Sequence, residues 1–441
     1  MARADGPLDV VWGATVLPVY GEIAQFGGRV VASALTADGR SVDYRGRWGS
    51  RPMWRIGYDL FKETRYLLSE GQPVPRASTP TLEWHIALLR HVLLQSGLSF
   101  AEIPPRPHGH DFICCLTHDV DFHGIRRHRL DRTMAGFLAR ASFGTLFDLV
   151  RGRRSLIEAS RNWGAVLSLP FVHLGLKRDF WRPFESYAKA EEGRRSTFFV
   201  VPRKGEPGVA PHGSTVRPTR AVPYQASEIR EEIRDALARG SEIGVHGIDA
   251  WHSPEAGRAE MQELTAVTGQ QAAGVRMHWL YFAESSPRAL ENAGFVYDST
   301  WGYNDAVGYR AGTSQVFRLS RTAQLLELPL SIMDSAMFFR GRMGLRRDDA
   351  LQRCGGLIAN ARRFGGTLVV NWHDRSLAPE RLWDESYRTL LTEIAAGDRA
   401  WFATAGEAVE WFRWRRSVRF LGNNGSGVTV YTLSLHDALP I

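Results

Sequence analysis

The sequence predicts an α/β protein in which a parallel sheet closes into a (β/α) barrel, with a smaller α/β extension at the N-terminus. Short apolar segments alternate with helical patterns between residues 111 and 420, an arrangement typical of parallel sheets. No glycine-rich phosphate-binding turn follows the first of these segments, which favours a barrel over a dinucleotide-binding fold. The proline-rich loop Ile103–Gly109 breaks regular structure and separates the barrel from an extension over residues 1–110.

Helical spacing of apolar residues predicts two helices in the extension, Tyr58–Leu68 and Leu82–Gln95. In the barrel, the apolar segments predict these strands: Phe112–His118, Thr197–Val201, Ile243–His246, Gly274–Met277, Phe295–Asp298, Leu325–Leu330, Thr367–Trp372 and Trp401–Ala403. Helices are predicted at Ala226–Ala238, Pro254–Leu264, Asp348–Arg363, Trp383–Ala395 and Gly406–Arg415. Gly240 is a stop signal after the first of these helices, and Ser253 before Pro254 is a start signal for the second.

Residues 122–185 are predicted to form a basic helical insertion in the barrel. They hold 12 Lys and Arg against 5 Asp and Glu, which accounts for most of the net charge of +8. Such a segment is more often a solvated helical face than a binding surface, although it can also rest on an anionic membrane or meet a phosphorylated substrate. No nucleic-acid-binding motif accompanies the charge, so nucleic acid is not an expected partner.

The composition is that of an ordinary globular protein, with 44% hydrophobic and 23% charged residues. No segment reaches the roughly 18 apolar residues of a membrane-spanning helix, and no secretory signal is visible. The three cysteines favour a reducing compartment, so the expected location is cytoplasmic. Residues 431–441 resemble the translation of a sequencing adaptor, and we expect them to be an artefact without a functional role.

Acidic, basic and imidazole side chains follow several of the predicted strands. Asp119 and Asp121 end the first strand and point the same way, because side chains alternate along a strand. His246, Arg276 and His373 lie at the ends of later strands. Since C-terminal strand ends meet at the mouth of a barrel, a carboxylate and two imidazoles there predict a three-ligand metal site with an open position.

This ordered set resembles the NodB-like polysaccharide deacetylases, the fourth carbohydrate esterase family, as a divergent member. The matching segments are Leu116–Asp121, Ser196–Val200, Glu242–His246, Val275–Leu280, Leu326–Leu330 and Val370–Asp374. The resemblance covers roughly residues 112–415. It implies a distorted (β/α) barrel that uses a divalent metal, most often zinc, to remove an N- or O-linked acyl group from a sugar.

The resemblance also implies a role for each strand-end residue. Asp119 resembles the catalytic base, and Arg276 would hold and orient it through a charge-assisted pair. Asp121 and His246 resemble metal ligands. His373 resembles the general acid that protonates the leaving amine.

Two positions depart from the family pattern. The second histidine ligand usually lies four residues after the first, where this chain has Ala250. We therefore expect His252 to be the third metal ligand, with Asp249 as its competitor, and a weak or inactive site if neither reaches the metal. His278 lies where the family usually has proline, and packing, substrate contact and metal ligation are considered for it in that order.

Aromatic side chains near the strand ends are candidate glycan contacts, because aromatic faces stack on sugar rings. They are Trp279, Trp301 and Tyr303, and a packed loop explains the last two equally well. Asp334 or Asp374 can orient the general acid.

The expected function is a metal-dependent deacetylase that acts on an N-acetylated sugar or a polysaccharide precursor, which can be lipid- or nucleotide-linked. A deformylase or another C–N amide hydrolase on the same site is one alternative. A carbohydrate-binding barrel without catalysis is another. A membrane-surface contact through the basic insertion is considered as well.

Overall fold

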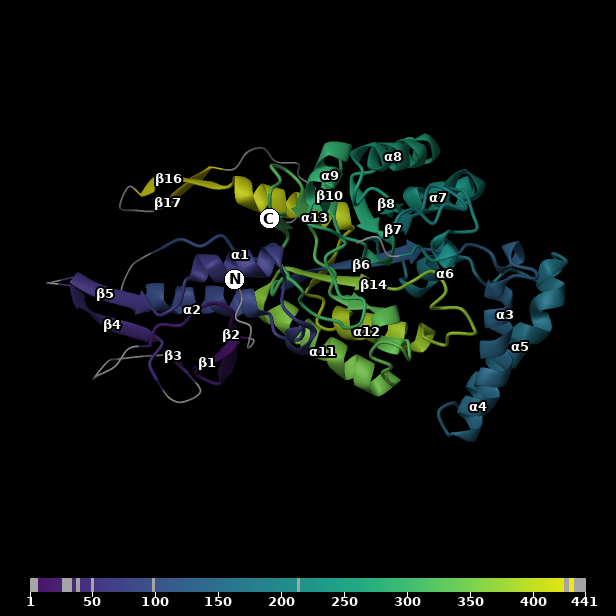
Figure 1. Cartoon of the computed structure of the whole chain (residues 1–441), viewed down its shortest axis with the longest axis horizontal. Helices are drawn as coiled ribbons and strands as arrows, with labels where there is room; N and C mark the ends of the chain where they lie inside the picture. The colour runs from purple at the N-terminus through teal and green to yellow at the C-terminus, as the bar shows by residue number, and fades with distance from the viewer. Residues whose placement is uncertain are drawn as a thin grey trace.

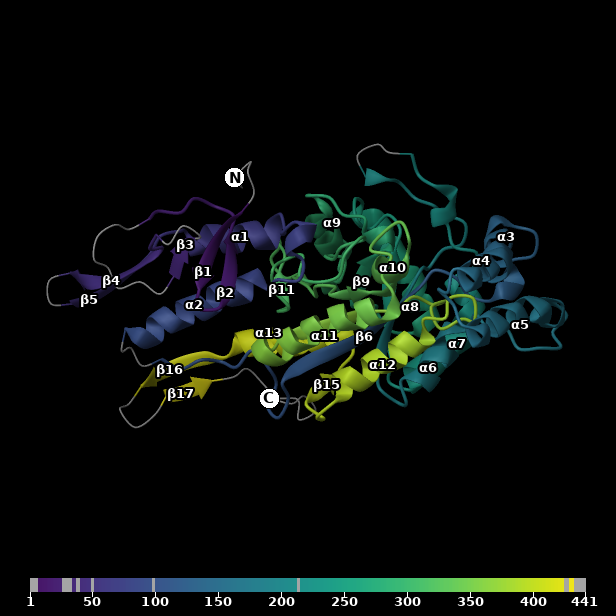
Figure 2. The same cartoon turned by 90° about the horizontal axis from the view of Figure 1, so that it is seen from below.

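A curled sheet of parallel strands forms the centre of the molecule (Figures 1 and 2). The computed structural model describes residues 7–25, 34–36, 40–48, 51–96, 100–211, 215–423 and 428–431. The strands follow the order β11 (Phe317–Arg318), β12 (Leu326–Glu327), β10 (Tyr297–Asp298), β9 (Gly274–Met277), β8 (Glu242–Gly247), β7 (Ser196–Val200), β6 (Phe112–Val120), β14 (Thr367–Asn371) and β13 (Ile332–Met333). All neighbours in this order are parallel except β11 and β12. The predicted distorted (β/α) barrel is confirmed, and within the described residues no ladder joins its two edges.

β6 is an interior strand of this sheet, between β7 and β14. All nine of its residues are buried, which explains why the sequence shows a continuous apolar run there rather than an alternating pattern. β15 (Ala400–Phe402) pairs with its first residues, Phe112–Cys114, β14 with Ile113–Thr117, and β7 with its last residues, Leu116–Val120. The strand therefore carries its last residues beyond β14 to the C-terminal edge of the sheet, beside β7.

Helices cover the sheet, and their ends follow the signals in the sequence. They are α7 (Arg230–Ala238), α8 (Pro254–Thr268), α9 (Ser286–Ala293), α10 (Asp334–Phe338), α11 (Arg347–Phe364), α12 (Asp384–Ala395) and α13 (Ala405–Ser417). The side chain of Ser253 caps α8 by accepting a hydrogen bond from the Ala256 N–H, and Gly269 ends that helix in the left-handed conformation.

The N-terminal extension contains strands as well as the two predicted helices. β1 (Leu8–Trp12), β2 (Thr15–Val19) and β3 (Ala34–Thr36) form one antiparallel sheet, and β4 (Asp43–Trp48) pairs with β5 (Arg51–Ile56). The helices are α1 (Leu60–Ser69) and α2 (Thr81–Gln95). Gln72 and Glu83 form hydrogen bonds to the barrel loop around residues 309–314. The domain boundary at residue 110 remains a prediction.

Between β6 and β7 the chain forms a group of helices that projects from the barrel (Figure 1). They are α3 (Arg132–Ala139), a π-helical turn (Arg140–Gly144), α4 (Thr145–Val150) and α5 (Leu156–His173), followed by α6 (Pro183–Ala190). No helix of the described residues combines the length and apolar character needed to cross a bilayer.

Each predicted barrel strand overlaps a strand of the sheet, whereas β11 and β13 were not predicted. At the C-terminus, β16 (Arg419–Asn423) pairs with β17 (Val428–Tyr431). The suspected artefact begins at the last residue of β17, and residues 432–441 lie outside the described part of the chain.

Candidate metal centre and active site

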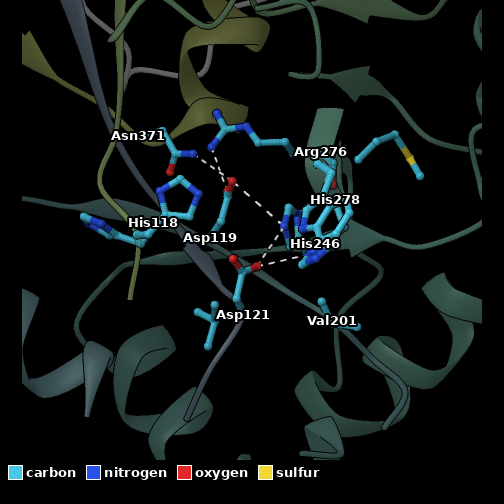
Figure 3. A network of polar contacts seen from close by, with 12 residues as sticks. His118, Asp119, Asp121, Val201, His246, Arg276, His278 and Asn371 are labelled. Atoms are coloured by element: carbon cyan, nitrogen blue, oxygen red, sulfur yellow. Dashed lines mark hydrogen bonds and ion pairs between the residues drawn. The ribbon is translucent and has the colours of Figure 1, made fainter. Parts of the chain in front are cut away.

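β6 delivers two carboxylates to the C-terminal edge of the sheet. Asp119 is the eighth residue of the strand, and Asp121 directly follows its end. Asp119 is directed toward Arg276 and Asn371, and Asp121 toward the imidazoles of His246 and His278 (Figure 3). His246 lies between the two carboxylates, with its Nε2 also 3.9 Å from Asp119 Oδ2. The neighbouring His118 is engaged elsewhere, as expected for a side chain on the other face of the strand. Its Nδ1 donates to the carbonyl oxygen of Trp372, and its Nε2 lies 2.7 Å from Glu191 Oε1.

Asp121, His246 and His278 bring three ligand atoms together. Asp121 Oδ1 lies 3.3 Å from His246 Nε2 and 3.1 Å from His278 Nδ1, and the ligand atoms of all three residues lie within 4.8 Å of one another. The two histidines are buried, while the Asp121 side chain is 19% exposed, so the group opens to solvent beside the carboxylate.

Hydrogen bonding and burial prepare both imidazoles for ligation. His246 Nδ1 lies 2.9 Å from the carbonyl oxygen of Arg276, which places the proton on Nδ1 and leaves Nε2 free to face Asp121. Burial lowers the pKa of His278, although the nearby Asp121 carboxylate acts in the opposite direction. Burial alone would raise the pKa of Asp121, but the two histidines hold it well below its usual value. An ionised carboxylate and unprotonated imidazole nitrogens are the forms in which these side chains bind metals.

The residues of this group fit a divalent cation. Among the described residues, the buried atoms Asp121 Oδ1 and His278 Nδ1 have no hydrogen-bond partner of ordinary geometry. Unpaired buried polar atoms are costly, and a shared cation would satisfy both of them. Two nitrogens and one oxygen with an open fourth position are a donor set typical of zinc.

The arrangement differs from the predicted ligand set at His252. That side chain is 33% exposed, and its Nε2 lies 3.4 Å from Asp249 Oδ1, outside the three-residue group. The loop is held there because the Ile248 and Asp249 N–H groups donate to Glu260, and because Asp249 accepts from the Val209 N–H. His278 instead lies beside Asp121 and His246, where we expected His252 or Asp249. Packing was the first expectation for His278.

Asp119 is held by two strong donors. Arg276 Nη1 lies 2.9 Å from its Oδ1, and Asn371 Nδ2 lies 2.7 Å from its Oδ2. Arg276 is fully buried and is itself positioned by hydrogen bonds to Thr117 and Ser299. Burial would raise the pKa of Asp119, but the Arg276 guanidinium, with smaller contributions from the nearby histidines, lowers it below its usual value.

His373 is paired with Asp334, one of the two residues that the sequence offered as its partner. Its Nδ1 lies 2.5 Å from Asp334 Oδ1, and its backbone N–H donates to Asp334 Oδ2 at 2.7 Å. Burial would lower the pKa of His373, but the Asp334 carboxylate raises it to about 9. Asp374, the other alternative, instead accepts from the Phe122 N–H.

The predicted aromatic contacts separate into two groups. Trp279 is half-buried with its ring 5.9 Å from that of His278, in a backbone conformation with φ of 63°. Trp301 is buried under Arg310, and the Tyr303 hydroxyl donates to the Gln72 carbonyl of the extension. Trp279 thus lies beside the metal group, whereas Trp301 and Tyr303 have packing roles, and glycan binding by any of the three remains a prediction.

Asn371 was not singled out in the sequence, although a signal for it was present. It lies two residues before His373 at the end of a predicted strand, and side chains two residues apart on a strand share one face. Amide side chains are common at strand ends, and only the 2.7 Å contact with Asp119 identifies this one as part of the site.

Comparison with solved structures finds likenesses in fold. One structure, which carries the name polysaccharide deacetylase and comes from Mycobacterium smegmatis, is 19% identical with a TM-score of 0.42, over 71% of this chain and 95% of that chain. A second of that name, from Pseudomonas aeruginosa PAO1, is 15% identical with a TM-score of 0.42, over 70% and 95%. Puue allantoinase is 14% identical with a TM-score of 0.42, over 71% and 93%.

Two of these structures carry the name of the family that the sequence motifs resemble. At such low identities the likeness concerns the fold alone. No family model matches the chain, and no curated protein matches it either.

Proposed function

We propose that this protein is a metal-dependent deacetylase that hydrolyses an N-acetyl group, or another acyl group, of a sugar. One observation carries the proposal: the three-ligand group of Asp121, His246 and His278 lies beside a separately held carboxylate, Asp119. The same rim of the sheet also holds a histidine that is protonated at neutral pH, His373. Amide hydrolysis needs an electrophile, a base and an acid, and these groups can supply all three.

The metal would be held by Asp121, His246 and His278. When bound, a divalent cation such as zinc polarises the acyl carbonyl and lowers the pKa of water. Asp119 is the proposed base. Its lowered pKa keeps it ionised at neutral pH, and its contacts with Arg276 and Asn371 fix the direction in which it can accept a proton.

His373 is the proposed acid. Its raised pKa keeps a proton on the ring at neutral pH, and Nδ1 is engaged by Asp334. Nε2 is therefore the atom that can donate a proton to the leaving nitrogen. Asp119 would accept the proton of the attacking water, and His373 would donate a proton to the leaving nitrogen. Together the two residues supply both proton transfers that amide hydrolysis requires.

The proposed substrate is a polysaccharide precursor linked to a lipid or nucleotide carrier, processed in the cytoplasm. The excess of basic residues between residues 122 and 185 supports an anionic carrier of this kind. Trp279 beside the metal group is the proposed stacking surface for the sugar ring.

Acetate release from N-acetylhexosamine conjugates by the full-length chain, loaded with zinc or cobalt, tests this function. Asp119→Asn should lower kcat/KM by about 100-fold or more, the usual contribution of a positioned base. Asp111→Asn is the matched control, because Asp111 lies just before the opposite end of β6 and pairs with Arg399.

Equal rates for Asp119→Asn and wild type would contradict the proposal. Sugar binding without acetate release from any conjugate would instead support a carbohydrate-binding barrel. Release of formate rather than acetate would support the deformylase alternative.

A further inference from the structure

Exposed hydrophobic side chains are concentrated on the helices that project from the barrel. Of the 24 large hydrophobic side chains that are exposed in the described part of the chain, 13 lie between residues 130 and 176. Large exposed apolar patches are rare on proteins that meet only water, and they often mark a binding surface. The 13 are Leu130, Leu138, Phe143, Leu146, Phe147, Val150, Leu156, Ile157, Trp163, Leu167, Phe171, Leu174 and Leu176.

On α5 these side chains form a stripe along one side of the helix. Leu156, Trp163, Leu167, Phe171 and Leu174 are separated by three, four or seven positions, so they share one face, and they are 74%, 37%, 74%, 54% and 73% exposed. The other residues on this face are small or uncharged, namely Ser160, Gly164 and Pro170. We refer to this face as the α5 stripe.

The charged residues of α5 are engaged away from the stripe. Glu158 forms a capping box with Ser155, and Arg161 pairs with Asp384 of the barrel. The opposite side of α5 is already used for packing, because Ala165, Leu169 and Val172 are buried in the core of the insertion. A solvated helix would carry charged residues on its free face, and α5 carries none there.

Basic residues flank the stripe at both ends. Arg151 and Arg153 lie just before α5, and Lys177 lies just after it. Within the described residues, no carboxylate forms an ion pair with any of these three cations. The Arg151 guanidinium instead lies 3.8 Å from the ring of the exposed Phe147. Apolar side chains between unpaired cations match a plane of anionic headgroups above hydrocarbon.

We propose that the helices α3–α5 bind the surface of a lipid bilayer that contains anionic headgroups. α5, which is about 27 Å long at 1.5 Å per residue, lies in the plane of the membrane with its stripe at the boundary between headgroups and acyl chains. The flanking cations contact lipid phosphates. The partner is a membrane rather than another protein because the charge at both ends of the stripe has one sign.

Binding at this surface would also orient the candidate active site. The insertion begins at Phe122, directly after Asp121, and the Phe122 N–H donates to Asp374. Trp181 closes the insertion by donating from Nε1 to Glu380 at 3.0 Å. The mouth of the barrel is therefore tied to the membrane-binding helices at both ends, although membrane binding itself does not depend on the proposed hydrolysis.

Flotation of the full-length chain with vesicles tests the proposal. The chain should float with vesicles of equal parts phosphatidylcholine and phosphatidylglycerol, and much less with phosphatidylcholine alone. The double variant Leu167→Ser with Phe171→Ser should weaken partitioning by about tenfold or more, because burial of one such side chain is worth about a factor of ten. Phe61→Ser with Leu94→Ser is the matched control, since both residues are exposed on helices of the extension.

A second variant tests the contribution of the flanking cations to membrane binding. Arg151→Glu with Arg153→Glu should reduce binding to the anionic vesicles and leave the weak binding to neutral vesicles unchanged. Thermal unfolding of each variant, compared with wild type, shows that the barrel is intact.

Equal flotation of wild type and Leu167→Ser with Phe171→Ser would overturn the proposal. So would a wild-type chain that floats with neither vesicle. A stable wild-type dimer that this same double variant converts to a monomer would also overturn it, because the stripe would then bind a second copy of the chain.

Discussion

Asp119 and Asp121 lie two residues apart at the end of β6, yet their oxygens face different chemistry. Both oxygens of Asp119 accept hydrogen bonds, from Arg276 and Asn371, so this carboxylate is fully engaged with the protein. Asp121 Oδ1 faces only two imidazole nitrogens. The first environment suits the proposed base and the second suits the proposed metal ligand, which is why we propose separate roles for them.

The choice between His278 and His252 as the third ligand leads to a direct prediction. His278→Ala should lower the affinity for zinc by about 100-fold or more, because loss even of an outer partner of a ligand costs 10- to 100-fold. His252→Ala should leave affinity unchanged, since His252 faces Asp249. Calorimetric titration with zinc measures both. The opposite order of effects would show that the loop after β8 rearranges to bring His252 to the metal.

The His373–Asp334 pair predicts the alkaline side of the pH profile. The pKa of His373 is about 9 in the folded chain, compared with an ordinary value of 6.5, so the ring stays protonated up to about pH 9. Stability from this pair is therefore fully present below about pH 6.5 and is lost as pH rises through about 9. A general acid must be protonated, so activity should also fall as pH rises through about 9.

Asp334→Asn removes the charge that raises the pKa of His373, so the alkaline fall in activity should move to lower pH. Rates of acetate release against pH measure this shift. Asp398→Asn, which changes an exposed loop carboxylate, should keep the wild-type profile. If activity falls at the same alkaline pH in the wild type and in Asp334→Asn, His373 is excluded as the acid.

At the scale of single elements, start and stop signals and apolar runs decide where strands and helices lie. α5 begins with a capping box in which the Ser155 hydroxyl accepts from the Glu158 N–H and Glu158 accepts from the Ser155 N–H. Two backbone donors that the helix cannot satisfy by itself are paired in this way. Of the residues of the α5 stripe, Leu156 lies in this first turn, so its position depends on the cap.

Ser155→Ala should therefore destabilise the first turn of α5 by about 1 kcal/mol. Hydrogen exchange in that turn should accelerate by roughly fivefold, while acetate release stays unchanged. Ser160→Ala is the matched control in the same helix. Its hydroxyl only donates back to the Ile157 carbonyl, and alanine is the better helix former, so exchange should stay equal or slow down. Equal acceleration in both variants would contradict a special role for the cap.

At the scale of the whole molecule, buried polar contacts join the N-terminal extension to the barrel. Glu83 of α2 is buried and accepts from the Thr313 hydroxyl at 2.7 Å and from the Ser314 N–H at 3.0 Å. Gln72 donates from its amide to the Tyr309 carbonyl at 2.6 Å. Buried contacts of this kind couple the stability of the two parts.

Glu83→Ala should lower the free energy of unfolding by about 1–3 kcal/mol, because two buried donors lose their acceptor. Glu83→Gln should cost less, since an amide oxygen can still accept and since burial raises the pKa of Glu83, which makes the ionised carboxylate the less favourable form. Chemical denaturation followed by fluorescence measures both. Two separate transitions in the wild type would show that the extension and the barrel unfold independently.

The sequence alone determined the central elements and the rim that holds the candidate site. The apolar run before Asp119 and Asp121 predicted β6 together with its acids, because a strand buried on both faces needs continuous hydrophobic residues. The histidine and arginine positions at later strand ends followed from the same logic, since parallel strands share one C-terminal edge.

Only the tertiary structure decided which side chains meet. His252 and His278 are equally suitable ligands by chemistry, but the hydrogen bonds of the loop after β8 direct one away from Asp121, whereas β9 directs the other toward it. The sequence also does not show which face of α5 is exposed. A helix with apolar residues on several faces does not reveal which of them the rest of the protein covers. Contacts between residues distant in sequence determine both outcomes, and local patterns carry no information about them.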